Sequence, residues 1–589
     1  MNSSSTTAVP ETRLTAPLAE LERLSFCDTS ATALGDWVTS LPMANTADAA
    51  AQVRQATWEI ARLTVSPEQR MALLEQIRPI LHYLCARLDR NAGTSATQGD
   101  AIARLAQRLQ TNLCSGYKAV ILAALEQREK GGQGDRQLLP LAIHRALSDL
   151  SRTLLRTLQF YVEPAERLWL ELNQLYLLAE RLGEADTALE DAENHTAPMT
   201  TPTSAYLRSL LLACSKPNQM RHRQLAEVFN CLEEWSKLVT LEPDATSALF
   251  AVDLESDQGP VYKRLMRDAV APRGIRTEVL VYQLESYLRE LPCEINVPDA
   301  ASEVQISHLA EAWGVMRPRS HRRLGTSGSI RVCVGLRAVH FFLSGGVEFS
   351  ETMADPDAIT GGELNPFLLD ARQRERHRPQ AAKDVWDDAF DLGARIPENP
   401  NIQNPERILR RERGKPAPAP DKSAHELFDT TAIDTSPGGY QIRWNDPLPP
   451  MLQTGELIGL REEADNRWCI AVIRWIRQNS EGTAMGIELL SPRAIPVAVR
   501  AVQKVGGSTS YARGLLLPEL APIGQPASLI TPRQPFQSGQ KVHLQNQGIR
   551  STAQLQQCLL KTESVNQFTY RMLSGYLENA RVNLNIGDL

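Results

Sequence analysis

The sequence predicts a multidomain α+β protein with an α-helical N-terminal half and two β-rich units in the C-terminal half. The length of 589 residues is too great for one hydrophobic core, so two to four domains are expected. Apolar residues recur at helical spacing as far as about Leu241. After Trp313 the pattern changes to short apolar runs separated by Gly, Pro and polar turns, which is typical of strands.

Composition and charge are those of a globular protein. The apolar share is 42%, the charged share is 22% and the net charge is -6, so the overall charge does not favour binding to a nucleic acid polymer. No apolar run is long enough to cross a bilayer, and the polar N-terminus lacks the regions of a signal peptide. We therefore expect a cytoplasmic protein with no direct membrane insertion, for which membrane association would need a partner.

The cysteine and histidine patterns do not indicate a metal or redox site. The nine cysteines include no C-x-x-C pair, and the ten histidines show no H-E-x-x-H or similar spacing. Most cysteines stand in apolar surroundings, which indicates buried free thiols in a reducing compartment. We expect neither a metal nor a cofactor.

The N-terminal half predicts one helical domain, residues 39–245. Residues 1–38 are polar and are expected to be disordered, apart from a possible short helix at 17–24. Ser66 and Pro67 match a helix N-cap followed by proline at the first helical position. The expected helices span residues 47–63, 67–90, 102–124, 139–163, 164–181, 204–214 and 221–241.

The segment around Trp169 bears on whether this domain is a helical repeat. Trp169, Leu172 and Tyr176 have the spacing of the W-x-x-L and tyrosine of a tetratricopeptide helix. The expected partner helix is displaced by residues 183–204, which are polar and rich in Asp, Glu, Thr and Pro, and no repeat period is visible. A helical bundle with Trp169 and Tyr176 as core residues is the favoured interpretation, and a degenerate helical repeat is the alternative.

Residues 246–316 predict an α+β connector. A strand is expected at 249–254, with helices at 276–290 and 301–313. The connector ends at a basic segment, Arg317-Pro318-Arg319-Ser320-His321-Arg322-Arg323, which an apolar strand at 330–336 follows. A ligand that binds these arginines would therefore affect the segment of chain that directly follows the helical region.

Two short motifs stand on either side of a long polar insertion. Arg319 and Arg323 form R-x-x-x-R, and Asp434, Ser436 and Gly439 form D-x-S-x-x-G between two strand-like runs. Such residues are also common in ordinary hairpin turns. In this order, with strands around them, the motifs resemble those of a PilZ domain, a small β-barrel that binds cyclic di-GMP. The resemblance implies a barrel that begins with residues 317–347, the arginine motif and first strand, and continues with residues 424–503.

The resemblance also implies a ligand site. The two motif arginines would contact phosphates and guanine faces, because a guanidinium fork suits paired phosphate oxygens, and Arg322 would add a contact. The aspartate and serine of the second motif would contact guanine, and its last glycine would allow close approach of the ligand. The implied cyclic di-GMP-binding residues are Arg319, Arg322, Arg323, Asp434, Ser436 and Gly439.

Two alternatives remain for the arginines. Arg407 and Arg411 repeat the R-x-x-x-R spacing nearer to Asp434, but a proline-rich tract follows them where the family has a strand. The segment 317–323 is otherwise a solvated basic linker, as most charge runs are. We favour Arg319 and Arg323 because a strand-like segment follows them.

The rest of the chain predicts a disordered insertion and more strands. Residues 348–423 are charged and proline-rich with few apolar residues, which indicates disorder, apart from a possible short helix at 385–390. Further strands are expected at 425–433, 439–444, 456–461, 468–478 and 483–490, with a helix at 494–501. Alternating apolar runs and turns in residues 504–589 predict a second small β-domain and a tail.

No catalytic constellation accompanies these motifs. The chain has no Walker loop, no G-x-S-x-G and no defensible acid–base pair, so we do not expect an enzyme. The resemblance implies a cyclic di-GMP receptor that transmits ligand occupancy to an unidentified protein partner through the helical region. By analogy with the family, the expected output is control of motility, pili or surface attachment. The alternative is a scaffold or adaptor protein with a degenerate PilZ domain that does not bind the ligand.

Overall fold

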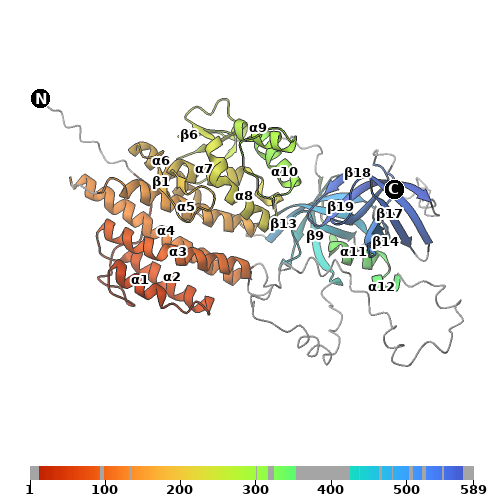
Figure 1. Ribbon diagram of the computed structural model, residues 1–589, viewed down its shortest axis with the longest axis horizontal. Helices are drawn as coiled ribbons and strands as arrows, with labels where there is room; N and C mark the ends of the chain where they lie inside the picture. The colour runs from red at the N-terminus through yellow and green to blue at the C-terminus, as the bar shows by residue number, and fades with distance from the viewer. Residues whose placement is uncertain are drawn as a thin grey trace, which may run out of the picture. The chain divides into compact units, whose positions relative to one another are not determined.

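The structure is a computed structural model of the chain (Figure 1). It describes residues 12–574 apart from 93–98, 132–134, 300, 316–323, 353–424, 437, 447, 463–466, 480–481, 503–508, 521–524 and 547–548. The chain divides into two compact units, one of residues 1–320 with 477–481 and the other of residues 321–476 with 482–589. None of the described helices combines the length and the apolar character needed to cross a membrane.

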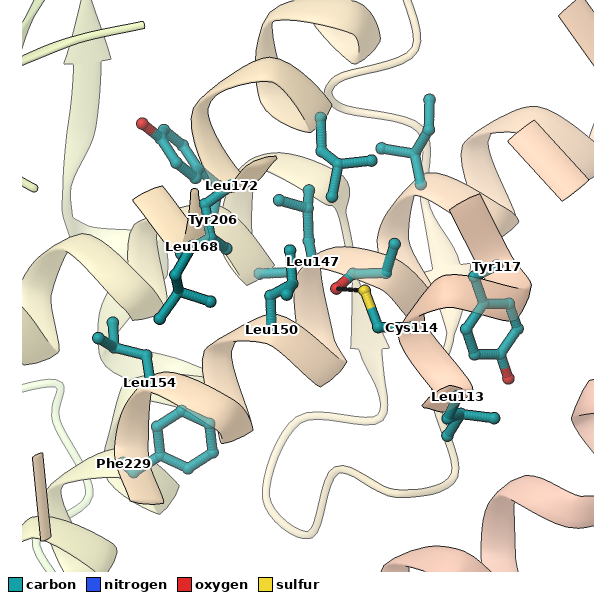
Figure 2. Packing of buried hydrophobic residues seen from close by; sticks show 14 of the residues in the cluster. Leu113, Cys114, Tyr117, Leu147, Leu150, Leu154, Leu168, Leu172, Tyr206 and Phe229 are labelled. Carbon is teal, nitrogen blue, oxygen red and sulfur yellow. Dashed lines mark hydrogen bonds between the residues drawn. The ribbon is translucent and has the colours of Figure 1, made fainter. Parts of the chain in front are cut away.

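The first unit is built on α-helices that share one hydrophobic core. The helix α5 (Leu138–Gln159) contacts α3, α4, α6, α7 and α8. Figure 2 shows Leu147, Leu150 and Leu154 of α5 among buried side chains from α4, α6, α7 and α8. The other helices are α1 (Ala31–Thr39), α2 (Thr46–Arg62), α3 (Pro67–Ala92), α4 (Gly99–Glu129), α6 (Leu168–Leu182), α7 (Pro202–Cys214) and α8 (His222–Trp235).

Trp169 and Tyr176 of α6 are core residues of this bundle. Their exposed fractions are 8% and 5%. The Tyr176 ring stacks on Tyr206 of α7 with 4.6 Å between ring centroids, and the Trp169 indole lies against the backbone of Gly259. The core-residue interpretation of this W-x-x-L segment is therefore confirmed.

The polar stretch between α6 and α7 contributes a buried ion pair. The strands β1 (Leu189–Glu190) and β2 (Met199–Thr200) form a short antiparallel ribbon, and Asp191 after β1 is fully buried. Both carboxylate oxygens of Asp191 accept hydrogen bonds from Arg78 of α3, at 2.7 and 2.9 Å. Burial alone would raise the pKa of Asp191, but the Arg78 guanidinium holds it well below its usual range.

Residues 12–38 belong to the core of the first unit, so the expected disorder as far as residue 38 is wrong for them. Leu14, Leu24 and Leu34 are buried, and Leu21 forms a β-bridge with Leu63. The predicted helix at 17–24 is absent, and the first described helix begins at Ala31. The buried leucines stand ten residues apart, which is a spacing without helical or strand periodicity, so the pattern did not reveal them.

The α+β connector shares the core of the helices. Its sheet has the order β3-β6-β4-β5, and Phe250, Ile275 and Trp313 join the apolar cluster of the bundle. The helix predicted at 221–241 ends early, at Trp235, because β3 pairs with the distant β6. The elements are β3 (Thr240–Glu242), β4 (Phe250–Asp253), β5 (Val261–Tyr262), β6 (Pro272–Arg276), α9 (Glu278–Leu288) and α10 (Glu303–Gly314).

The second unit contains the predicted first barrel. Six strands close in the order β10-β13-β12-β11-β8-β9, with β9 paired to β10 and the short β7 added on β9. Alternate residues such as Val332, Ile442 and Ile487 fill its interior. The strands are β7 (Leu324–Gly325), β8 (Ser329–Val334), β9 (Phe428–Ser436), β10 (Gly439–Trp444), β11 (Leu457–Glu462), β12 (Cys469–Asn479) and β13 (Gly482–Ser491).

A helix follows the first long strand of this barrel, in place of the last two residues of the strand predicted at 330–336. The strand β8 ends at Val334, and α11 (Gly335–Leu343) begins at a glycine with φ +87°. The predicted strand at 330–336 is therefore too long by two residues. The helix packs on β8 and β11 of the first barrel and on β14 and β15 of the second. Both barrels and α11 thus share one apolar cluster, which includes Val339, Leu457 and Leu515.

The two ends of the predicted insertion lie together. The short helix α12 (Phe349–Thr352) begins it, and His425 at its far end has Nε2 2.7 Å from Oε1 of Glu348. The His425 ring also stacks on Phe341 of α11, with 3.9 Å between centroids. The predicted disorder of residues 348–423 is wrong for 348–352, where α12 forms and Phe349 is buried. The rest of that segment, the short helix predicted at 385–390 and the alternative arginines Arg407 and Arg411 lie outside the described residues.

The second small β-domain is a closed six-stranded barrel of order β14-β15-β16-β19-β18-β17. The helix predicted at 494–501 is wrong, because this segment is β14 and pairs with β15 and β17. The predicted boundary at residue 503 consequently lies too late, since β14 belongs to the second barrel. The strands are β14 (Ile495–Ala501), β15 (Ala512–Leu517), β16 (Ser528–Pro532), β17 (Lys541–Asn546), β18 (Ile549–Lys561) and β19 (Val565–Ser574).

Candidate ligand-binding site

The D-x-S-x-x-G motif forms a hairpin between β9 and β10. The register pairs Ser436 with Gly439 and Asp434 with Gln441, and the Ser436 hydroxyl donates a hydrogen bond to the Gly439 carbonyl at 3.3 Å. The serine therefore closes the turn that its own motif forms. Asp434 is half-buried.

Gly439 is required by the barrel itself. A β-carbon at this position would lie 1.9 Å from the carbonyl oxygen of Ile487 on β13, and φ is +154°. The next glycine back, Gly438, has open space around it. Strand β13 therefore lies close against Gly439 and requires a glycine there. The role in ligand binding that the resemblance implies for Gly439 stays a prediction.

The strand β7 connects the two motifs. Leu324 pairs with Thr435 and Gly325 pairs with Asp434, and the Thr326 amide donates to the Ile433 carbonyl at 3.1 Å. Arg323 precedes Leu324 by one peptide bond. The chain that leaves R-x-x-x-R therefore continues directly along the strand of D-x-S-x-x-G.

The predicted site residues divide between described and undescribed parts of the chain. The hairpin brings Asp434, Ser436 and Gly439 together, and the three arginines of the motif, Arg319, Arg322 and Arg323, lie outside the described residues. The competing arginine pair at 407 and 411 lies outside them as well.

Trp475, which was not predicted from the sequence as a site residue, lies near the hairpin. The registers place Gly325, Asp434, Gln441 and Gly486 opposite one another on β7, β9, β10 and β13. A β-carbon on Gly486 would lie 1.8 Å from Nε1 of Trp475, so the half-buried indole of β12 occupies the place of the missing side chain. The line of paired residues that runs from Gly325 through Asp434 to Gly486 is therefore covered at its Gly486 end by an aromatic ring. The one available signal was the presence of this tryptophan in the strand predicted at 468–478.

Two polar pairs lie close to the same hairpin. Glu488 of β13 stands opposite Gly439 and accepts a hydrogen bond from Arg474 Nε at 2.6 Å. The Tyr440 hydroxyl donates to Glu462 at 2.8 Å. Burial and this hydrogen bond raise the pKa of Tyr440, so the phenol stays neutral at physiological pH. The arrangement offers carboxylate and aromatic contacts and holds no nucleophile paired with a base among the described residues of the hairpin.

Comparisons with known proteins place these observations in one family. Three family models match successive parts of the chain: the N-terminal domain of the cyclic-di-GMP receptor FimW at 32–245, its middle PilZ domain at 249–496 and its C-terminal β-barrel domain at 497–573. The cyclic-di-GMP receptor FimW of Pseudomonas aeruginosa is 33% identical over 588 residues, covering 95% of this chain and 94% of that protein. This chain belongs to the FimW family. No solved structure matches it.

The FimW family domains agree with the observed architecture. The middle PilZ domain of the family begins at 249 and so includes the α+β connector together with the first barrel. The family boundary at 496/497 falls inside β14, next to the start of the second barrel. The predicted PilZ barrel, helical N-terminal half and second β-domain are therefore confirmed.

Proposed function

We propose that this chain is a cyclic di-GMP receptor whose site lies at the β9–β10 hairpin of the PilZ barrel. The observation that carries the proposal is the pairing of β7 with β9, because it joins the end of the arginine motif to the strand of Asp434. Two motifs far apart in sequence then act on one ligand. The name of the Pseudomonas aeruginosa relative supports the same ligand.

The chemistry of the residues suits a cyclic purine dinucleotide. A carboxylate accepts two hydrogen bonds side by side, so Asp434 matches the N–H donors of a guanine edge. Arg319 and Arg323, with Arg322, supply guanidinium forks for the two phosphates. The exposed part of the Trp475 indole gives a second purine face a surface on which to stack, a contact that contributes about 1–3 kcal/mol per base.

Calorimetric titration of the full chain tests this proposal. Cyclic di-GMP should bind, while cyclic di-AMP, which lacks the guanine edge, should not. Asp434→Asn should weaken binding by about 1.5–3 kcal/mol, the range of a hydrogen bond to a charged group. Asp429→Asn on the same strand is the control, because its exposed side chain pairs with Arg331 and should not matter. Equal heats for both dinucleotides, or no heat with cyclic di-GMP, would overturn the assignment.

We further propose that ligand occupancy passes to a protein partner through the helical region. Residues 316–323 join α10 to β7 along the chain, so contacts to the motif arginines act on the link between the two units. A ligand shifts such an equilibrium only by its differential affinity for the two arrangements. Hydrogen exchange should change in α7 and α8 when cyclic di-GMP is added. Changes in hydrogen exchange that are confined to the barrel would contradict the proposed transmission to the helical region but not the proposed ligand site. Motility, pilus or surface-attachment control is the output we propose, by family analogy.

A further inference from the structure

The second barrel is strongly basic although the whole chain is acidic. Residues 497–573 contain eight Lys or Arg and two Asp or Glu, a net charge of +6, against -6 for the chain. The strands β14, β17, β18 and β19, which neighbour one another in the barrel, contain no acidic residue. Charge asymmetry of this kind is typical of a domain that binds an anionic polymer or surface.

The cations of these strands project from the outside of the barrel. Arg500 of β14 lies opposite His543 of β17. Two residues along, Lys541 lies opposite Gln554 of β18, whose Oε1 accepts a hydrogen bond from Arg571 of β19 at 3.4 Å. The residues between them on β14 and β17 are buried in the barrel core. With strands about 5 Å apart and alternate residues about 7 Å apart, these cations lie within about 16 Å. The basic face comprises Arg500, Lys541, Arg550 and Arg571.

Exposed aliphatic side chains border the basic face at one end of the barrel. Ile549 at the start of β18 is 47% exposed, and Leu573 near the end of β19 is 40% exposed. Because β18 and β19 are antiparallel, both lie at the same end. Ile549 directly precedes Arg550, and Leu573 follows Arg571 by two residues. Aliphatic groups beside cations suit a lipid surface, where cations meet headgroup phosphates and aliphatic groups enter the acyl boundary.

We propose that the basic face, with Ile549 and Leu573, binds the surface of a bilayer that contains anionic lipids. Single-stranded nucleic acid would need open aromatic rings for stacking, and the ring of Tyr511 beside this face is covered by the Arg500 guanidinium, 4.6 Å from its centroid. The contact is peripheral and needs neither a membrane-spanning helix nor the partner that membrane association was expected to require. It goes beyond the cyclic di-GMP site and does not depend on that site being occupied.

Vesicle co-sedimentation of the full chain tests the proposal. Vesicles with roughly one third phosphatidylglycerol should bind the protein, vesicles of phosphatidylcholine alone should not, and added salt should release it. Each cation at an anionic surface contributes about a factor of five. Lys541→Glu with Arg571→Glu should therefore weaken binding about 25-fold or more. Ile549→Ser with Leu573→Ser should also weaken it, which a purely ionic contact would not require.

The matched control is Arg128→Glu with Lys130→Glu at the exposed end of α4, which changes the net charge equally and should leave vesicle binding unchanged. Unaltered thermal unfolding of each variant establishes that the barrel is folded. Equal binding to neutral and anionic vesicles, no binding to either, or loss in the α4 control would overturn the proposal. Salt-sensitive capture of a single-stranded oligonucleotide in place of vesicles would assign the face to nucleic acid and reject the lipid surface.

Discussion

Leu324 of β7 lies opposite Thr435 of β9, so the residue that follows the arginine motif pairs with a residue inside D-x-S-x-x-G. A long insertion separates the two motifs in sequence, yet its ends meet at Glu348 and His425. An insertion whose ends are held together in this way lowers the stability of the barrel little, because the entropy of loop closure grows slowly with loop length. The pairing explains how one ligand site can use both motifs.

The two adjacent glycines of the hairpin should respond differently to substitution. Gly439→Ala should lower the free energy of unfolding by about 2 kcal/mol or more, because the new methyl group meets the Ile487 carbonyl. Gly438→Ala, which enters open space, is the control and should change stability little. Thermal unfolding of both variants checks this, and equal stability of the two would remove the structural requirement at Gly439.

Trp475→Leu should weaken cyclic di-GMP binding by about 1–3 kcal/mol through the loss of base stacking. The indole also fills the space above Gly486, so unfolding must be measured on the same variant. Trp58→Leu on α2, where the side chain is 38% exposed, serves as the control. Unchanged affinity for the Trp475 variant would leave the tryptophan as a packing residue alone.

Asp191→Ala should destabilise the helical unit by about 3–5 kcal/mol, because it leaves the Arg78 guanidinium buried without its carboxylate. The exposed pair of Lys130 and Glu126 provides a comparison, and Glu126→Ala should change the free energy of unfolding far less, because solvent screens this pair. Chemical unfolding followed by far-UV circular dichroism measures both. A small effect of Asp191→Ala would mean that the buried pair adds little to stability.

Acid should destabilise the second unit partly through His340 of α11. Burial, with a smaller effect of Arg513, lowers the pKa of His340 to about 4, whereas an unfolded histidine titrates near 6.5. The stability that neutral His340 contributes is therefore complete above about pH 6.5 and is lost as the pH falls towards 4. His340→Gln should flatten the pH dependence of unfolding over that range, and His543→Gln should flatten it less, because burial and Arg500 lower the pKa of this half-buried surface histidine by a smaller amount. A profile unchanged in His340→Gln would contradict this assignment.

Local sequence patterns predicted the strands that carry the D-x-S-x-x-G motif. They failed for segments whose secondary structure depends on pairing or packing with residues far away in the sequence. The strands of the first barrel after Phe428 followed from alternation, and the hairpin at Asp434 followed from its turn residues. The segment at 494–501 was predicted as a helix because its pairing partners, β15 and β17, lie later in the chain. The helix α11 is short and apolar, and only its packing between two barrels distinguishes it from a strand.

The candidate site shows the same division. Asp434, Ser436 and Gly439 were identified from one short motif, and the structure brings them together. Trp475 was not identified, because it reaches the line of paired residues that contains Asp434 only through its packing over Gly486, which the registers of β9, β10 and β13 place there. The structural demand on Gly439 likewise comes from β13, which a motif on β9 and β10 does not reveal.

Calorimetric titration of cyclic di-GMP into two paired variants tests the central claim most directly. Arg319→Ala with Arg323→Ala removes the arginine motif next to β7, and Arg407→Ala with Arg411→Ala removes the pair of equal spacing inside the insertion. Each lost contact between a guanidinium and a phosphate should cost about 1.5–3 kcal/mol, so the first variant should lose at least about 100-fold in affinity. The second should bind like the parent chain. Loss of binding in the second variant, with the first unaffected, would contradict the account.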